Sequence, residues 1–123
     1  LSTLLSSGVV PIINENDALS DDESKVGDND HLAALVTSLV SSDLLILFSR
    51  VPGILTDLGR GSVLPRVEPE EDASVHVSPE QSELGVGGMA AKISAARLAS
   101  DWGVPTVIAS GRDVGLLPRI VAG

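Results

Sequence analysis

The sequence predicts an α/β fold built on a mainly parallel sheet, on three observations. Apolar runs of strand length occur at Val9–Ile13, Leu44–Phe48 and Val104–Ala109. Segments with helical spacing of apolar residues alternate with these runs. The run Leu44–Phe48 is apolar at every position, as a strand covered by helices on both faces would be. This order of strands and helices is typical of a parallel sheet with helices on its faces.

The first half of the chain is expected to form a short helix, a strand and a longer helix. Leu1–Ser7 has helical spacing, and Gly8 stands where a helix-ending glycine belongs. The β-branched run Val9–Ile13 predicts a buried strand. A helix is predicted from Asp30, with one face packed inward. The apolar residues of that face are Leu32, Leu35, Val36, Leu39 and Val40.

The second half is expected to contain more loop than the first. Residues Val51–Gly61 are rich in turn-forming Pro and Gly, and Pro65–Glu83 predicts an exposed, acidic excursion. An alanine-rich helix is predicted from Met89 to about Trp102, ended by Gly103. A final helix is predicted over Val114–Val121.

The composition excludes several classes of function. The 123 residues, of 12.6 kDa, fit one domain or part of one. A net charge of −9 argues against nucleic acid or an anionic membrane as a partner. No apolar run approaches the ~18–20 residues that span a bilayer. The absence of cysteine excludes disulfides, thiolate metal sites and a cysteine nucleophile, and is consistent with a cytoplasmic protein.

Two polar loops carry the clearest signal for a binding site. Asn14–Asp17 follows the first predicted strand, and Gly27–Asp30 leads into the next helix. Carboxylates and amide oxygens accept hydrogen bonds from an ammonium, while amide groups and helix N-termini donate to a carboxylate. A zwitterionic amino acid fits this mixture of groups. The alternative is ordinary turn and helix-capping chemistry, which uses the same residue types.

A glycine-rich segment, Gly85–Lys92, opens the alanine-rich helix. Backbone N–H groups at a helix N-terminus attract anions, and Lys92 on the first turns is within reach of a phosphoryl group bound there. The ending of a Walker A loop is absent, so a simple glycine-rich helix start is the alternative. The turn Ser49–Thr56, directly after the middle strand, either lines a nucleotide pocket or only reverses the chain.

In their order along the chain, these segments resemble the glutamate 5-kinase family of the amino acid kinase superfamily. The matching motifs are Val9–Asp17, Lys25–Asp30, Leu84–Lys92 and Val104–Gly111. The resemblance covers essentially the whole chain, and Gly61–Glu83 is its loosest part. Four motifs in one order are far more specific than any one of them.

The resemblance implies a three-layer α/β/α sandwich with a mainly parallel sheet. Residues 1–123 would be the C-terminal portion of one amino acid kinase domain, whose N-terminal part is missing. The family uses ATP and Mg²⁺ to phosphorylate the side-chain carboxylate of L-glutamate, giving glutamyl 5-phosphate for proline synthesis. Feedback inhibition by proline and a homo-oligomer are also expected. Because the family's first glycine-rich loop and its lysine lie upstream, we expect the 123-residue piece alone to be inactive.

The resemblance also implies roles for individual residues near the substrate. Asp17 and Asn29 would hold glutamate, with Asn14 and Asp30 close by, and Asp28 would organise the catalytic cationic groups. The substrate carboxylate, with a reference pKa of about 4.3, is already an anionic nucleophile and needs no general base.

Lys92 would stabilise the transferred phosphoryl group, and no metal ligand is assigned. The residues expected to face ATP are Ser49, Arg50, Val86, Gly87, Gly88, Met89, Ala90, Ala91 and Lys92.

Three departures from the family pattern lie on the nucleotide side. Ser49-Arg50 stands where Thr-Asp is usual, Val86 replaces a usual Thr, and the acidic-proline-arginine run after Thr56 is absent. These departures keep other functions open: a sister amino acid kinase, or a non-catalytic module that senses glutamate or proline. A bifunctional synthase, with a reductase domain after Gly123, is a third alternative.

Overall fold

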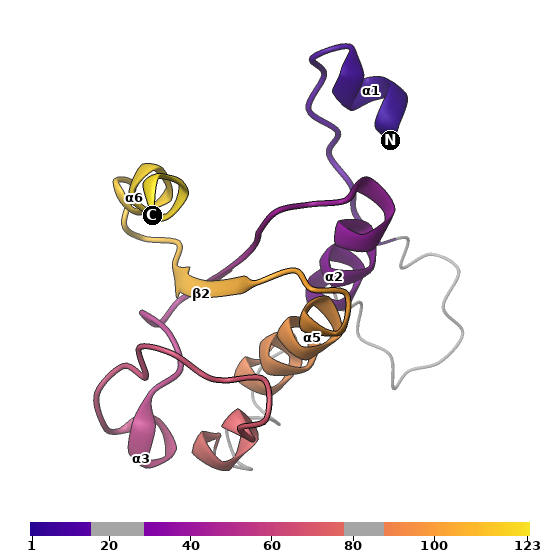
Figure 1. Cartoon of the computed structure of the whole chain (residues 1–123). Helices are drawn as coiled ribbons and strands as arrows, with labels where there is room; N and C mark the ends of the chain where they lie inside the picture. Colours follow the sequence, from indigo (N-terminus) through magenta and orange to yellow (C-terminus); the bar gives the residue numbers. More distant parts are fainter. Residues whose placement is uncertain (16–28, 78–87) are drawn as a thin grey trace.

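The computed structural model describes residues 1–15, 29–77 and 88–123 (Figure 1). Within these residues, no helix is long and apolar enough to cross a membrane. The elements, in chain order, are α1 (Ser2–Ser6), α2 (Asn29–Val40), β1 (Leu45–Ser49), α3 (Thr56–Gly59), η2 (Ala73–His76), α5 (Met89–Asp101), β2 (Thr106–Ser110) and α6 (Leu116–Ala122).

A small parallel sheet confirms the predicted α/β class. Strands β1 and β2 pair in parallel, in a register that runs from Leu45 opposite Thr106 to Ser49 opposite Ser110. Helix α5 lies between the two strands in sequence and packs against both of them, which is a β-α-β unit. The carboxyl ends of both strands therefore lie at the same edge of the sheet.

The predicted strand Val9–Ile13 is wrong for this structure. No residue of the run lies in a strand, and the side chains of Val10 and Ile12 are 83% and 97% exposed. β-Branched residues favour an extended backbone, but a strand also needs a neighbour for its N–H and C=O groups. Among the described residues, β1 and β2 pair only with each other.

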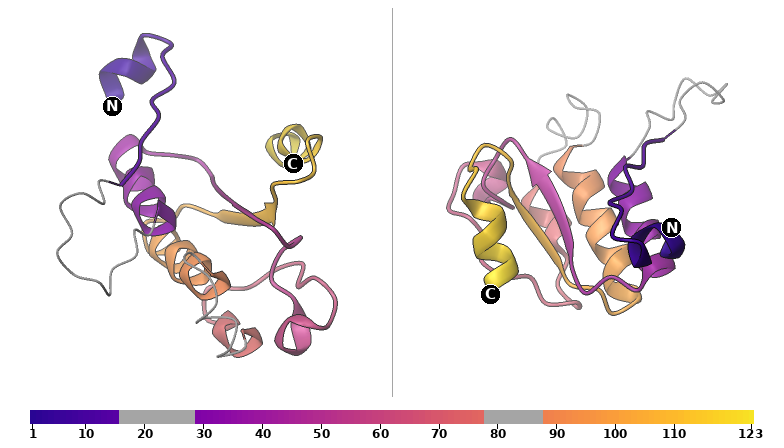
Figure 2. Two further views of the ribbon diagram at one scale, coloured as in Figure 1. Left: turned by 180° about the vertical axis from the view of Figure 1, so that it is seen from behind. Right: turned by 90° about the horizontal axis from the view of Figure 1, so that it is seen from above.

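The core lies between the strands and two helices that pack side by side, α2 and α5 (Figures 1 and 2). Small side chains form the contact between the helices: Ala34 on α2 and Ala95 and Ala99 on α5 are all 0% exposed. Leu45 and Leu47 of β1 pack against them from the sheet. Small residues let two helix backbones approach closely, so this contact depends on the absence of larger side chains.

The predicted inward face of α2 is only partly correct. Leu35 and Leu39 are exposed, whereas the buried residues are Ala34 and Thr37. The Thr37 hydroxyl donates to the Ala34 carbonyl at 2.7 Å, so the buried polar group is satisfied within the helix. The spacing of apolar residues therefore located the helix correctly. It assigned the buried face to large apolar side chains, whereas the residues that the structure buries are smaller.

The sheet is covered by α2 and α5 on one face. On the other face Phe48 is 46% exposed. The prediction that helices cover this strand on both faces is therefore correct for one face only. Helix α6 lies across the strands from α2 and α5 (right view of Figure 2). It matches the helix predicted over Val114–Val121 to within two residues at its start.

The predicted ends of α1 and α5 are confirmed. Gly8 and Gly103 follow the two helices with φ values of 73° and 75°, a left-handed conformation that favours glycine. After α5, the N–H of Val104 donates to the Ala99 carbonyl at 3.0 Å, as in a Schellman motif. The same pattern of bonds closes α1.

The acidic excursion is exposed as predicted over most of its described part, residues 65–77, but it is anchored to α5. Ala73 is 5% exposed, and Arg97 of α5 contacts the Asp72 carboxylate at 2.8 Å. Hydrogen bonds from the Ser74 hydroxyl and backbone N–H, with Arg97 beside them, hold the pKa of Asp72 below its usual value. The turn-rich segment before it contains α3, where Asp57 and Leu58 adopt left-handed backbone.

Candidate functional site

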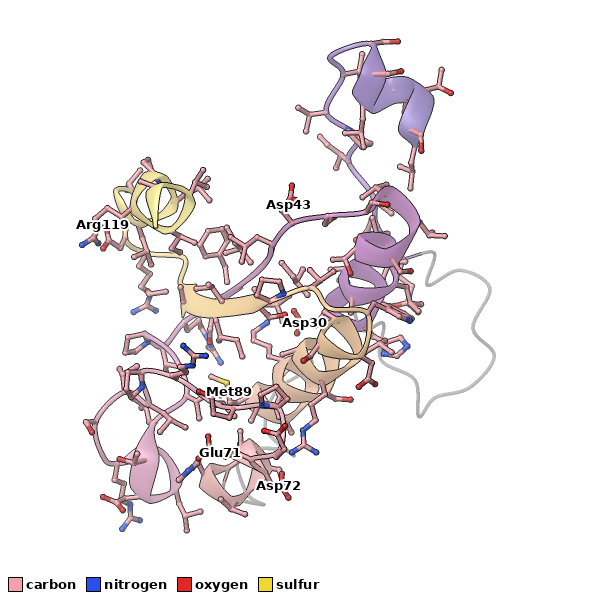
Figure 3. The ribbon with its side chains drawn as sticks, viewed as in Figure 1. Asp30, Asp43, Glu71, Asp72, Met89 and Arg119 are labelled. Atoms are coloured by element: carbon pink, nitrogen blue, oxygen red, sulfur yellow. The ribbon has the colours of Figure 1, made fainter. Side chains whose placement is uncertain are left out.

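An ion pair joins the first turns of α2 and α5. The ammonium of Lys92 lies 2.8 Å from both carboxylate oxygens of Asp30. The side chains are only 11% and 15% exposed, respectively, and Figure 3 shows Asp30 between the two helices. A cation near a helix N-terminus is unfavourable in the field of the helix dipole, and the Asp30 carboxylate offsets this cost. An ammonium has three N–H donors, so two bonds to Asp30 leave one for another acceptor.

Next to this ion pair, Asn29 at the start of α2 forms hydrogen bonds with Asn14 and Glu15. Its side-chain N–H donates to Asn14 Oδ1, and its Oδ1 accepts from the Glu15 backbone N–H, both at 3.1 Å. Asn14 in turn donates to the Glu15 carbonyl at 3.0 Å. Because Asp30 follows Asn29 in sequence, these bonds place the amide groups beside the ion pair.

The structure thus brings together four of the predicted site residues: Asn14, Asn29, Asp30 and Lys92. They come from three places along the chain, and Asp30 and Lys92 are 62 positions apart. Four other predicted site residues lie outside the described residues: Asp17, Asp28, Val86 and Gly87.

The carboxylate that contacts Lys92 is Asp30. The sequence assigned the organisation of the cationic groups to Asp28, and Asp30 to the vicinity of glutamate. Asp30 lies on the first turn of α2, where its side chain faces α5. The role of Asp28 stays a prediction.

The residues predicted to face ATP lie at two places. Gly88 caps α5 with extended backbone, and Met89, Ala90 and Ala91 form its first turn (Met89 is labelled in Figure 3). Ser49 is the last residue of β1 and lies opposite Ser110 of β2, and Arg50 comes directly after it.

Arg50 is exposed and has no ion pair with any residue in the described stretches. The Ser49 hydroxyl accepts from the Val51 N–H at 3.4 Å, so it organises the turn that carries Arg50. At the adjacent strand end, Gly111 donates to the Ser49 carbonyl at 2.9 Å. The carboxyl ends of parallel strands are the usual place for ligands in open α/β sheets.

A metal-binding cluster is not formed by the parts of the chain described above. Within residues 1–15, 29–77 and 88–123, no group of three His, Asp or Glu side chains is arranged to hold a metal ion. Asp30 is already engaged by Lys92. The described site is thus a cation beside amide and carboxylate groups.

Comparison with known proteins gives the family. Residues 1–110 match the Amino acid kinase family, which is most of the chain. The chain belongs to the amino acid kinase family.

Curated relatives are similar to this amino acid kinase chain along its whole length. The glutamate 5-kinases of Syntrophotalea carbinolica and Hydrogenovibrio crunogenus are each 44% identical over 130 residues, covering 100% of this chain and 34% of the relative. The glutamate 5-kinase of Symbiobacterium thermophilum is 42% identical over 127 residues, covering 100% of this chain and 48% of the relative. The chain spans between about a third and a half of the length of these relatives.

These relatives confirm the resemblance to glutamate 5-kinases but correct the placement of the chain. The matched region belongs to the N-terminal part of the relatives and not to their C-terminal part. Where the chain lies within a complete amino acid kinase domain stays a prediction.

Proposed function

We propose that this chain is part of a glutamate 5-kinase, which transfers the γ-phosphoryl group of ATP to the side-chain carboxylate of L-glutamate. The observation that carries the proposal is the Asp30–Lys92 pair beside the Asn14–Asn29 bond. It combines a fixed cation with groups that suit a zwitterionic amino acid. The similarity to curated glutamate 5-kinases supports the same choice of substrate.

The proposed reaction needs positioning and positive charge. A carboxylate oxygen of glutamate attacks the γ-phosphorus, a new O–P bond forms, and the bond from phosphorus to the bridging oxygen of ATP breaks, releasing ADP. No proton has to be removed from the nucleophile. Lys92, held in place by Asp30, donates its remaining N–H to a phosphoryl oxygen as negative charge moves toward the leaving group.

On the glutamate side, Asn14 and Asn29 are described residues of the proposed pocket. Asp17 and Asp28 are assigned to it by the resemblance. The amide groups are fixed by bonds to each other and to the Glu15 backbone, so they offer hydrogen bonds without first losing side-chain freedom.

On the nucleotide side, the phosphates would approach the start of α5, where backbone N–H groups of the helix have no partner within it. Val86 and Gly87 would complete this loop, and Ser49 and Arg50 would contact the nucleotide from the edge of the sheet. The described residues do not assemble a Mg²⁺ site of their own.

The remaining family features belong to the same proposal. They are a three-layer sandwich, of which β1, β2 and their helices form a part, assembly into a homo-oligomer, inhibition by proline and a role in proline synthesis. The Mg²⁺ requirement is proposed on the same ground.

The test uses the full-length protein with glutamate and MgATP, and measures both ADP release and glutamyl phosphate trapped with hydroxylamine. Asn29→Ala should raise the KM for glutamate about tenfold or more while the KM for ATP changes little, because one amide contact to a charged ligand is lost. Ser38→Ala, an exposed position on the same helix, is the matched control. Faster turnover of aspartate, N-acetylglutamate, carbamate or a nucleotide than of glutamate would assign the chain to a sister kinase.

A second candidate function is a degenerate kinase that binds glutamate or proline without catalysis. The observation that favours it is Arg50, a cation in place of an acid at the end of β1. Calorimetry with the full-length protein separates the two functions. Binding of the amino acid without binding of MgATP would support the sensor, and binding of both would support the kinase.

A further inference from the structure

The carboxylate of Glu15 has a buried oxygen without a partner. Its Oε2 atom is shielded from solvent, and no donor among the described residues reaches it. Only one other buried side-chain atom in the described residues is in the same state, the hydroxyl of Thr106. Glu15 lies directly after Asn14, and its backbone N–H is bonded to Asn29 in the proposed glutamate pocket.

An unsatisfied carboxylate oxygen is costly to bury, since it loses its hydrogen bonds to water and gains none in return. The hydrogen bonds that the donors of this site make go to other acceptors. Asn29 donates to Asn14, Asn14 donates to the Glu15 carbonyl, and Lys92 donates to Asp30. A carboxylate oxygen that the fold buries without a partner, beside fixed polar groups, is typical of a functional site and not of a structural contact.

We propose that the Glu15 carboxylate binds the α-ammonium group of the amino acid substrate and thereby decides which end of the substrate faces Lys92. The proposal rests on the glutamate kinase function proposed above. An ammonium supplies the charged N–H donor that Glu15 lacks, and a bond between two charged groups is stronger than one between neutral groups.

The charges of the site set the direction of the substrate. The backbone N–H of Glu15 bonds to Asn29, and Asn29 is followed in sequence by Asp30, which holds Lys92. A carboxylate of the substrate is repelled by Glu15 and attracted by Lys92. Glutamate therefore binds with its ammonium toward Glu15 and its reacting carboxylate toward Lys92. The residue thus positions the substrate and takes no part in the phosphoryl transfer.

The experiment compares glutamate with glutarate, which is the same dicarboxylate without the ammonium group. Dissociation constants of both are measured by competition on the full-length protein and on Glu15→Gln. We expect the preference for glutamate over glutarate to fall about 10- to 100-fold in Glu15→Gln, the range of one hydrogen bond to a charged group. Glu70→Gln, an exposed acidic residue outside the site, should keep the preference of the wild type.

A structural role predicts a different result. If Glu15 only supported the loop, Glu15→Gln would weaken both ligands equally and lower the Tm, and an unchanged preference would overturn the proposal. Our proposal predicts an unchanged or raised Tm, because the charge beside a buried oxygen without a partner is removed. Glu15→Met is the second variant. Failure of both variants to fold would also overturn the proposal, since the carboxylate would then hold the loop together.

The same measurement separates this inference from the proposed function. Turnover of glutamate by the wild type with an unchanged preference in Glu15→Gln would refute only the role of Glu15. Absence of glutamate binding by the wild type would refute both.

Discussion

At the scale of single residues, the ion pairs of the described residues differ in how far they are buried. Asp30 and Lys92 are 15% and 11% exposed, while every side chain in the other three ion pairs of the described residues is at least 49% exposed. An exposed pair contributes about 0–1 kcal/mol because water screens both charges. Breaking a buried pair costs more, since one charge remains in the interior.

Lys92→Met in the full-length protein should therefore lower both stability and activity. We expect a loss of about 2–4 kcal/mol in the free energy of unfolding by urea, and a fall in kcat of about 100-fold or more. Asp30→Asn combined with Lys92→Met should recover part of the stability but none of the activity. Arg66→Ala, in the exposed pair with Glu68, is the control and should cost less than about 0.5 kcal/mol. Equal losses for Lys92→Met and Arg66→Ala would contradict this account.

Arg50 allows a second prediction at the residue scale. It is exposed at the end of β1, in a protein of net charge −9, and it has no ion pair within the described residues. An unpaired guanidinium there should attract the phosphates of a nucleotide. Arg50→Ala should raise the KM for ATP about three- to tenfold and leave the KM for glutamate unchanged. Arg60→Ala, also exposed but located after α3, should change neither constant. A lower KM for ATP in Arg50→Ala would show that the cation hinders nucleotide binding.

At the scale of elements, the contact between α2 and α5 holds the proposed site together. Lys92 and Asp30 meet only because these helices lie close, and they lie close because Ala34, Ala95 and Ala99 are small. The packing of three alanines therefore links the core to the chemistry of the site.

Ala99→Leu should separate the helices. Ala99 is 0% exposed, so there is no space around it for the additional carbon atoms of leucine, and we expect a loss of about 1–3 kcal/mol in the free energy of unfolding. Ser100→Leu adds the same side chain to an exposed position of α5 and should change stability by less than about 0.5 kcal/mol. Thermal and urea unfolding of both variants give the comparison, and equal stability of the two would show that the helix contact tolerates a larger side chain.

At the scale of the whole molecule, the 123-residue chain leaves large apolar side chains in contact with water. Val10, Ile12 and Val114 are 83%, 97% and 95% exposed, and two strands form its described sheet. Exposed apolar groups of this size are typical of surfaces that another part of a protein covers. The curated relatives are two to three times longer than this chain, which agrees with that interpretation.

We therefore expect the isolated 123-residue chain to form no glutamyl phosphate. The purified chain is incubated with glutamate and MgATP, and hydroxylamine traps any product as a hydroxamate. The full-length protein under the same conditions is the positive control. Hydroxamate above the background without protein would show that these residues alone are sufficient for the reaction.

Patterns along the chain were sufficient for most of the helices, for both described strands and for the family. Helical spacing and glycines located α2 and the ends of α1 and α5, and the apolar runs located β1 and β2. These features depend on neighbours a few residues apart, because helix ends and strand propensity are local properties. The ordered motifs indicated the amino acid kinase family, which the match over residues 1–110 confirms.

Only the tertiary structure decided which side chains meet. The carboxylate of Asp30 was found on Lys92, and the Oε2 atom of Glu15 was found buried without a donor. The exposure of Val10 and Ile12 likewise contradicted a strand that their sequence favoured. These outcomes depend on contacts between distant segments, such as the one between Asp30 and Lys92, which are 62 positions apart, and on whether a neighbouring strand is present. Local sequence patterns carry the backbone preferences of a segment, whereas burial and pairing are properties of the packed molecule.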